Sequence, residues 1–189
     1  MSRQFLARAA ALVIAAALFV LPMADGQVVD DPQLLEQLRQ LFPDAGSFAA
    51  KSGNPPAFKA FGAAASGQEP ALLGYAFWTT ELEPLERGFD GPIKMLVGMD
   101  TAGVLKGIIV TEHHEPYGYF SVDTPEFAAQ FKGKNIRDKF QVGGDVDAIS
   151  RATISVTSSS RAIRNSSRRV ARTYLAPAKP DPQPATPSQ

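Results

Sequence analysis

The feature that most constrains the fold is a pair of apolar stretches, residues 93–99 and 104–112, joined by Asp100-Thr101-Ala102-Gly103. Two strand-like stretches on either side of a short turn that contains glycine predict an antiparallel hairpin. Two further strand-like stretches precede this hairpin, near residues 57–64 and 71–80. Strands that follow one another without intervening helices favour an antiparallel sheet over a doubly wound nucleotide-binding fold.

Helices are predicted before and after these strands. Asp31-Pro32 begins the first helix, because proline suits the first helical position, and Pro43 ends it. A short helix follows Thr124-Pro125-Glu126 and runs to about residue 131. The sequence therefore predicts an α+β fold: a twisted antiparallel sheet with an N-terminal helix and a C-terminal helix in a single domain.

The C-terminal helix is expected to begin at residue 157 or 158 and to end near residue 175. Residues 46–56 are expected to form a loop, and residues 140–149 a strand and a turn. The apolar residues that would face the core from the last helix are Ala162, Ile163, Val170 and Leu175.

The two ends of the chain are not expected to belong to this domain, which spans residues 30–175. Arg3 and Arg8 precede an apolar run, residues 9–24, that is short for a membrane span of about 20 residues. Residues 1–26 are therefore interpreted as a secretory signal, with an uncleaved membrane anchor as the alternative. Either interpretation places the domain in the periplasm or another extracytoplasmic space. The proline-rich residues 177–189 predict an extended, disordered tail.

Composition excludes several kinds of chemistry. Among 189 residues, 19 Lys and Arg balance 19 Asp and Glu, so a nucleic-acid partner is not expected. The absence of cysteine excludes thiolate zinc sites, iron–sulfur clusters and cysteine nucleophiles. His113 and His114 are adjacent, and their side chains would point to opposite faces of a strand. One packed and one solvated histidine, rather than a metal site, is therefore expected.

Charge is concentrated near the C-terminus. Residues 151–172 contain arginine but no acidic residue, and this run is either a solvated helix face or a site for an anion or a docking partner. The arginines of this run are Arg151, Arg161, Arg164, Arg168, Arg169 and Arg172.

The segment Asp147-Ala148-Ile149-Ser150-Arg151-Ala152-Thr153-Ile154-Ser155 lies just ahead of the last predicted helix and is rich in hydroxyl groups. The start of a helix offers free N–H groups and the positive end of the helix dipole, which together favour a phosphate. Hydroxyl donors and a nearby arginine would add charge-assisted hydrogen bonds. Serine and threonine before a helix are also its most common caps, so these residues alone leave both interpretations open.

This segment resembles the flavinylation motif of the FMN-binding domain family: Asp147, Ser150, then Ala152-Thr153, and Ser155. The resemblance implies that a separate FMN transferase attaches FMN to Thr153 through a phosphoester bond. Arg151, which would also lie at the cofactor, occupies a position where many members have glycine. Glycine permits backbone conformations with positive φ, and arginine adopts these conformations only at a cost in free energy.

Residues 41–45, 74–77, 91–100 and 112–116 resemble the NosR type of this domain, so the resemblance covers roughly residues 33–172. It implies an exported electron-transfer flavoprotein domain that binds FMN, has membrane or periplasmic redox proteins as partners, and serves a NosR-like respiratory pathway. Such a chain is an electron carrier and a substrate of the transferase rather than an enzyme. The alternative is a periplasmic regulatory or partner-binding module with no flavin or a loosely bound one.

Three aromatic residues follow the histidines closely: Tyr117, Tyr119 and Phe120. Flat aromatic side chains can cover the isoalloxazine ring of a flavin, because the ring buries well against apolar surface. They can equally be part of an ordinary hydrophobic core, and the sequence leaves both possibilities open.

Overall fold

The computed structural model describes residues 28–64 and 67–175. The predicted signal segment, residues 1–26, and the proline-rich residues 177–189 lie outside these ranges. Within them, no helix combines the length and the apolar character needed to cross a membrane.

The strands form one antiparallel sheet in which each strand pairs with the next one along the chain, in the order β1-β2-β3-β4-β5. This arrangement confirms the predicted α+β fold and its hairpin, in which Val97 of β4 lies opposite Ile108 of β5. The hairpin turn is held by Asp100, whose Oδ1 accepts hydrogen bonds from the N–H groups of Ala102 and Val104 at 2.9 Å each. The strands are β1 (Ala45–Ser52), β2 (Ala57–Gly62), β3 (Leu72–Trp78), β4 (Lys94–Asp100) and β5 (Leu105–Glu112).

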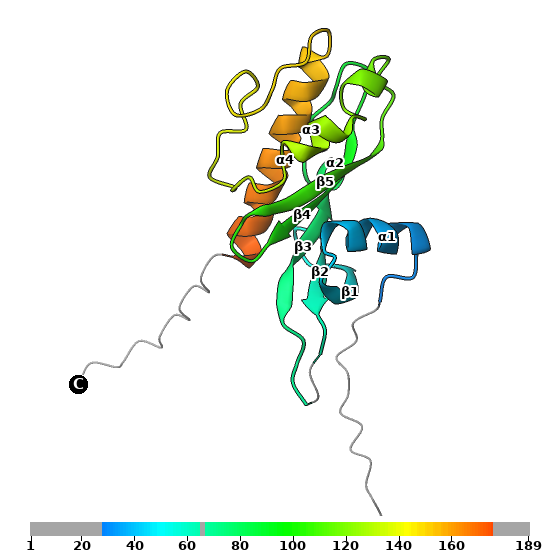
Figure 1. The fold of residues 1–189 in the computed structure, drawn as a ribbon, viewed down its shortest axis with the longest axis vertical. Coiled ribbons are helices and arrows are strands. Elements are labelled where there is room, and N and C mark those ends of the chain that lie inside the picture. Colours follow the sequence, from blue (N-terminus) through cyan, green and yellow to red (C-terminus); the bar gives the residue numbers. More distant parts are fainter. Residues whose placement is uncertain (1–27, 65–66, 176–189) are drawn as a thin grey trace, which may run out of the picture.

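Helices cover both faces of the sheet (Figure 1). α1 (Pro32–Leu41) packs on one face, and α4 (Thr153–Tyr174) packs on the other together with α2 (Thr79–Leu82) and α3 (Pro125–Ala129). The alternation of side chains along β4 serves both cores: Met95 and Val97 face α4, whereas Leu96 faces α1. A short 3₁₀ turn, η1 (Gly118–Phe120), follows β5.

α1 begins and ends where the sequence predicts. The Asp31 carboxylate caps it by accepting from the N–H groups of Gln33 and Leu34 at 2.9 and 3.2 Å. Its last residue is Leu41, which lies against Gly98 of β4: a Cβ on this glycine would come within 3.1 Å of the Leu41 Cβ. Glycine therefore lets the helix approach the sheet closely.

Two loop and strand predictions are wrong. Residues 46–56, expected as loop, contain most of β1, whose Phe48 lies opposite Ala60 of β2. The small residues of this stretch show no alternation of apolar and polar side chains and have low strand propensity. The strand forms because it pairs with β2. Residues 140–149, expected as strand and turn, contain no strand, only an isolated bridge between Val142 and Val146.

α4 begins at Thr153, about one turn earlier than expected. Its first backbone hydrogen bond runs from Val156 N–H to the Ala152 carbonyl at 2.9 Å, so Thr153 and Ser155 lie within the helix, whereas residues 147–152 precede it. Ala162, Ile163 and Val170 are buried as predicted, and Leu175 packs half-buried at the helix end. Buried serines line the rest of the inner face, where their small side chains bond to carbonyls one turn back.

Candidate functional site

The start of α4 presents unpaired backbone donors. The N-cap residue is Ala152, which has no side chain able to cap the helix. In the part of the chain that the structure describes, the N–H groups of Thr153, Ile154 and Ser155 find no acceptor. Free N–H groups at the positive end of a helix dipole form a binding site for an anion such as a phosphate.

Thr153 is the first helical residue and is exposed, so its hydroxyl is accessible beside these donors. Ala152 and Ser155, in contrast, are 5% and 3% exposed. The loop ahead of them is fixed by a hydrogen bond from Asp147 N–H to Gln130 Oε1 at 2.6 Å. The remaining residues that the motif singles out, Asp147, Ser150 and Arg151, are exposed and follow one another around the turn into the helix.

Arg151 adopts the left-handed backbone conformation, with φ of 67°. Only glycine enters this region without steric cost, and other residues pay roughly 1–2 kcal/mol. The backbone of this chain therefore has a glycine-like conformation at the position where the resemblance expects glycine. The Arg151 side chain itself is exposed.

A buried carboxylate joins three segments beneath the start of α4. Glu115, which follows β5 and is 9% exposed, accepts hydrogen bonds from the N–H groups of Phe89 and Asp90 at 3.2 and 3.1 Å. It also accepts one from the hydroxyl of Ser155. These contacts fix the loop between α2 and β4 against the first turn of α4. Sequence reasoning missed this role, because nothing in the spacing links Glu115 with a residue 40 positions away.

The histidine pair behaves as the sequence predicts, with His113 half-buried and His114 exposed. His113 Nδ1 accepts from Glu115 N–H at 3.0 Å, so its ring proton is on Nε2, which lies 2.7 Å from Asp123 Oδ1. His113 thus holds the segment that carries Glu115. In residues 28–64 and 67–175, no three acidic or histidine side chains gather as a metal site would require.

Exposed apolar side chains occur on the segments that Glu115 joins. Tyr117 and Tyr119 are 47% and 75% exposed, so they are not ordinary core residues, and both pack against the ring of Phe120. Phe89 and Ile154 are 68% and 57% exposed. The start of α4 and the segment of η1 lie at the same end of the molecule, the top of Figure 1. This end therefore combines anion-binding N–H groups with apolar surface.

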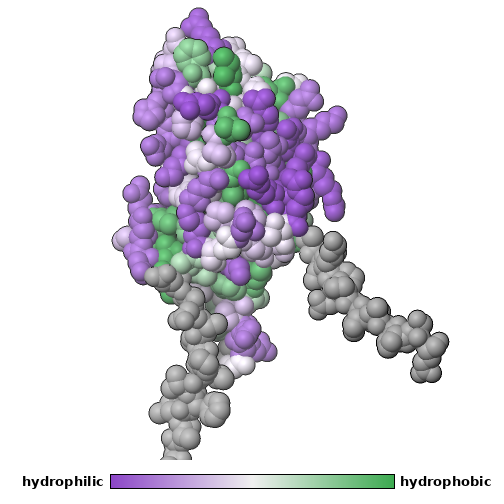
Figure 2. All heavy atoms as spheres, turned by 180° about the vertical axis from the view of Figure 1, so that it is seen from behind, coloured by the Kyte–Doolittle hydropathy of each residue, from purple (hydrophilic) through white to green (hydrophobic). Residues whose placement is uncertain are grey.

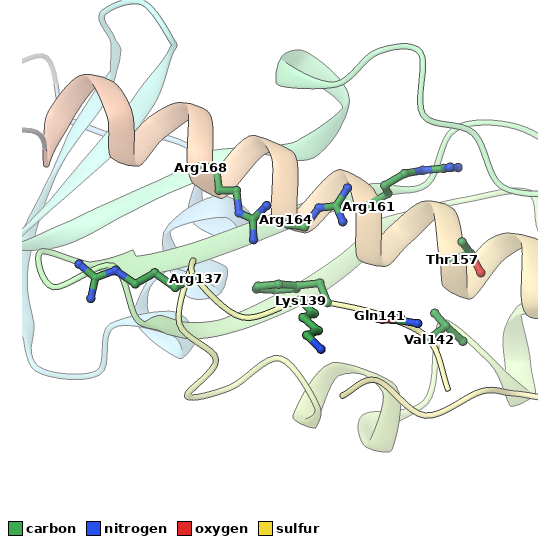
Figure 3. A pocket seen from close by; sticks show the side chains of 9 residues that line it. Arg137, Lys139, Gln141, Val142, Thr157, Arg161, Arg164 and Arg168 are labelled. Atoms are coloured by element: carbon green, nitrogen blue, oxygen red, sulfur yellow. The ribbon is translucent and has the colours of Figure 1, made fainter. Parts of the chain in front are cut away.

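An open groove of about 540 Å³ runs beside α4 (Figure 3). One wall is α4 and the other is the loop of residues 137–142. The groove begins at Thr157, one helical turn from Thr153. No acidic residue lines it, and its basic residues are Arg137, Lys139, Arg161, Arg164 and Arg168.

The carboxylate of Asp145 shapes the loop wall of this groove by accepting from Phe140 and Gln141 N–H at 3.0 and 2.6 Å. Burial alone raises the pKa of Asp145. The N–H groups of Gln141 and Phe140 and the charge of Lys134, 3.2 Å away, outweigh burial and hold the pKa below its ordinary value.

The arginines of α4 do not form one uniform solvated face. Arg169 donates to the Leu82 carbonyl at 2.5 Å and thereby holds α2 on α4. Arg168 donates to the carbonyls of Ile136 and Asp138 at 2.7 and 2.8 Å and holds the groove loop. Several of these side chains are therefore structural, and only part of the run is available to a ligand.

Comparisons with known proteins show what this chain is similar to. Residues 88–168, which include Glu115 and the start of α4, match the FMN-binding domain. The chain is 33% identical over 127 residues to a protein of the ion-translocating oxidoreductase complex of Methanosarcina acetivorans, an alignment covering 65% of this chain and 63% of that protein. It is 30% identical over 134 residues to the regulatory protein NosR of Pseudomonas aeruginosa, covering 65% of this chain and 18% of NosR. The chain thus spans less than two thirds of either relative.

Proposed function

We propose that this chain, whose residues 88–168 match the FMN-binding domain, is an electron-transfer flavoprotein domain whose FMN is attached covalently to Thr153. FMN is the cofactor that the family match indicates. Bound FMN would accept and release electrons, and the protein would contribute attachment, orientation and electrostatics.

One observation carries the attachment site: Thr153 is the exposed first residue of a helix whose first N–H groups are unpaired. A phosphate esterified to the Thr153 hydroxyl would lie within reach of those donors and of the positive helix end. In forming the ester, the hydroxyl loses its proton and the phosphate of FMN loses one oxygen with its proton. The product is therefore the chain plus FMN less one water.

Other residues of the chain would orient the cofactor without reacting. Glu115 fixes the first turn of α4 by accepting from Ser155 and from the loop that carries Phe89. The exposed rings of Phe89, Tyr117 and Tyr119 would offer apolar surface to the isoalloxazine ring. The basic groove would favour a negatively charged, reduced flavin, because unpaired cations stabilise nearby negative charge.

Location and partners belong to the same proposal. The names of the two relatives describe a component of an ion-translocating oxidoreductase complex and a regulatory protein. By analogy with the first, this chain would exchange electrons with membrane or periplasmic redox proteins. The signal-like residues 1–26 support export, and an FMN transferase would be needed to load the flavin.

The test of attachment is co-expression with an FMN transferase, followed by flavin fluorescence in a denaturing gel. Thr153→Ala is expected to abolish fluorescence in the protein band, because the ester requires the hydroxyl. Thr153→Ser should retain part of it. Since the Thr153 side chain is exposed and caps nothing, its removal should change the free energy of unfolding by no more than about 0.5 kcal/mol, less than the roughly 1 kcal/mol expected for a lost cap.

Thr157→Ala is the matched control, because Thr157 lies one turn further along the same helix and lines the groove. It should keep the fluorescence of the wild type. A fluorescent Thr153→Ala band would contradict the assignment.

A second function, a regulatory or partner-binding module without covalent flavin, is favoured by Arg151. An arginine in a left-handed conformation two residues before the attachment residue adds bulk where the resemblance expects glycine. The name of NosR also describes a regulatory protein. A wild-type chain that stays without flavin in the presence of a transferase that loads another FMN-binding domain would favour this function.

A further inference from the structure

The basic groove beside α4 carries more positive charge than its surroundings neutralise. Glu86 neutralises one basic residue of the groove, Arg161, at 3.0 Å, and the Asp145 carboxylate of the loop wall pairs with Lys134 at 3.2 Å. Among the described residues, no carboxylate pairs with the other basic side chains of the groove. These side chains are Arg137, Lys139, Arg164 and Arg168.

The groove is elongated and partly preorganised. From Thr157 to Arg168 it follows α4 for roughly 16 Å, at about 1.5 Å per residue. Figure 3 shows Arg164 and Arg168 projecting from the helix on the side of the loop that forms the other wall. Arg168 is fixed by its bonds to the Ile136 and Asp138 carbonyls, so little side-chain entropy remains to be lost on binding. Figure 2 shows that hydrophilic residues dominate this edge of the molecule.

We propose that this groove is a docking surface for an extended, acidic segment of a partner protein. Arg164 and Arg168 are one turn apart, a rise of about 6 Å. Alternate residues of an extended chain point the same way at intervals of roughly 6.6 Å. Carboxylates at alternate positions would therefore meet the Arg164 guanidinium group and the Nη1 group of Arg168, which takes no part in the two bonds of Arg168 to the loop. A small anion needs donors that converge on one point, and here they are spread along an open groove.

Charge complementarity also determines the rate and the salt dependence of the interaction. The chain as a whole carries no net charge, so attraction to an acidic partner would be local to this groove. Association through exposed charges is fast, weakens with salt and releases easily, which suits a transient encounter. The groove begins one turn from Thr153. The docking proposal does not require a flavin. Peptide binding can therefore fail while flavin attachment is found, and flavin attachment can fail while peptide binding is found.

The experiment measures binding of a labelled peptide to the purified chain by fluorescence anisotropy. The probe is a ten-residue peptide with glutamate at alternate positions, and its control has glutamine in place of each glutamate. We expect the glutamate peptide to bind and to weaken steeply as salt rises. Equal binding of the glutamine peptide would overturn the proposal.

Variants locate the binding surface. Lys139→Gln with Arg164→Gln removes two charges from the groove but no bond between elements, since the Arg164 Nε bonds only to its neighbour Asn165. This double variant should bind the glutamate peptide at least about tenfold more weakly. Arg39→Gln with Lys106→Gln removes two charges from outside the groove and should bind as the wild type does. Equal affinities of the two double variants would overturn the proposal.

Competition distinguishes other anions. Two competitors are compared at equal concentration of negative charge: inorganic phosphate and the unlabelled glutamate peptide. Phosphate should displace the labelled probe far less well than the peptide does. If phosphate displaces it equally well, the groove binds small anions and the proposal is wrong. The proposal is also wrong if a ten-nucleotide single-stranded DNA binds more tightly than the peptide and loses affinity in the groove variant.

Discussion

Among single residues, Arg151 occupies a backbone conformation in the turn before α4 that favours glycine, and substitutions there can test this conformation. Its φ of 67° is costly for any side chain and worst for a branched one. Arg151→Gly should raise the free energy of unfolding by up to about 1 kcal/mol, and Arg151→Val should lower it by at least about 1 kcal/mol. Urea denaturation measures both. A valine variant as stable as the glycine variant would contradict the left-handed conformation.

Glu115 offers a second test at this scale. Its carboxylate accepts from two backbone N–H groups and from the Ser155 hydroxyl, and glutamine can accept with only one of its two terminal atoms. Glu115→Gln should therefore lower the free energy of unfolding by about 1–3 kcal/mol, the cost of leaving buried donors unpaired.

Glu112 supplies the control, because it is exposed and its ion pair with Lys94 is long, at 3.8 Å. Glu112→Gln should change stability by less than about 0.5 kcal/mol in the same urea experiment. Equal losses in the two variants would show that Glu115 does not hold the start of α4.

Thr153 and Glu115 also show how far sequence reasoning reaches. The motif around Thr153 is continuous in the chain and can be read directly, and the structure adds that this residue is exposed at the start of a helix. Its role stays a prediction. Glu115 could not be assigned, because its partners Phe89 and Ser155 come from distant segments and meet only in the folded molecule.

At the scale of elements, the sequence predicts those that are fixed by local signals. α1 follows from Asp31-Pro32 and Pro43, and the hairpin of β4 and β5 from its apolar stretches and turn. β1 escapes prediction because small residues give no apolar alternation, and its strand depends on pairing with β2. The start of α4 lies earlier than predicted because serine and threonine resemble caps, whereas here the buried serines face the core.

The loop that walls the groove makes a prediction about pH. The pKa of Asp145 is held below its ordinary value of 3.8, so its carboxylate stabilises the folded loop above that pH and loses this effect as pH falls through the lower folded pKa. In an NMR titration toward acid, the amide signals of Phe140 and Gln141 should move with a midpoint below 3.8.

Asp145→Asn should remove this transition, whereas Asp147→Asn, a change at an exposed residue two positions on, should leave it in place. A midpoint at or above the ordinary value would mean that the N–H groups and Lys134 do not outweigh burial.

At the scale of the whole molecule, the sheet carries helices on both faces and brings three separate segments to one end. The sequence predicts the sheet and its flanking helices, since antiparallel neighbours follow one another along the chain. It could not predict the groove, because Arg137 and Lys139 lie in a loop that comes to face α4 only in the folded molecule, where Arg168 bonds to the loop and Phe140 packs in the core beside α4.

Peptide mapping of the wild-type chain after co-expression with an FMN transferase tests whether FMN is esterified to Thr153. Trypsin cleaves after Arg151 and Arg161, so Thr153 falls in the peptide of residues 152–161, whose other hydroxyl residues are Ser155, Thr157, Ser158, Ser159 and Ser160. Mass spectrometry should find this peptide heavier by one FMN less one water, and fragmentation should place the added mass on Thr153. An unmodified peptide, or added mass on any other serine or threonine of this peptide, would contradict attachment of FMN at Thr153.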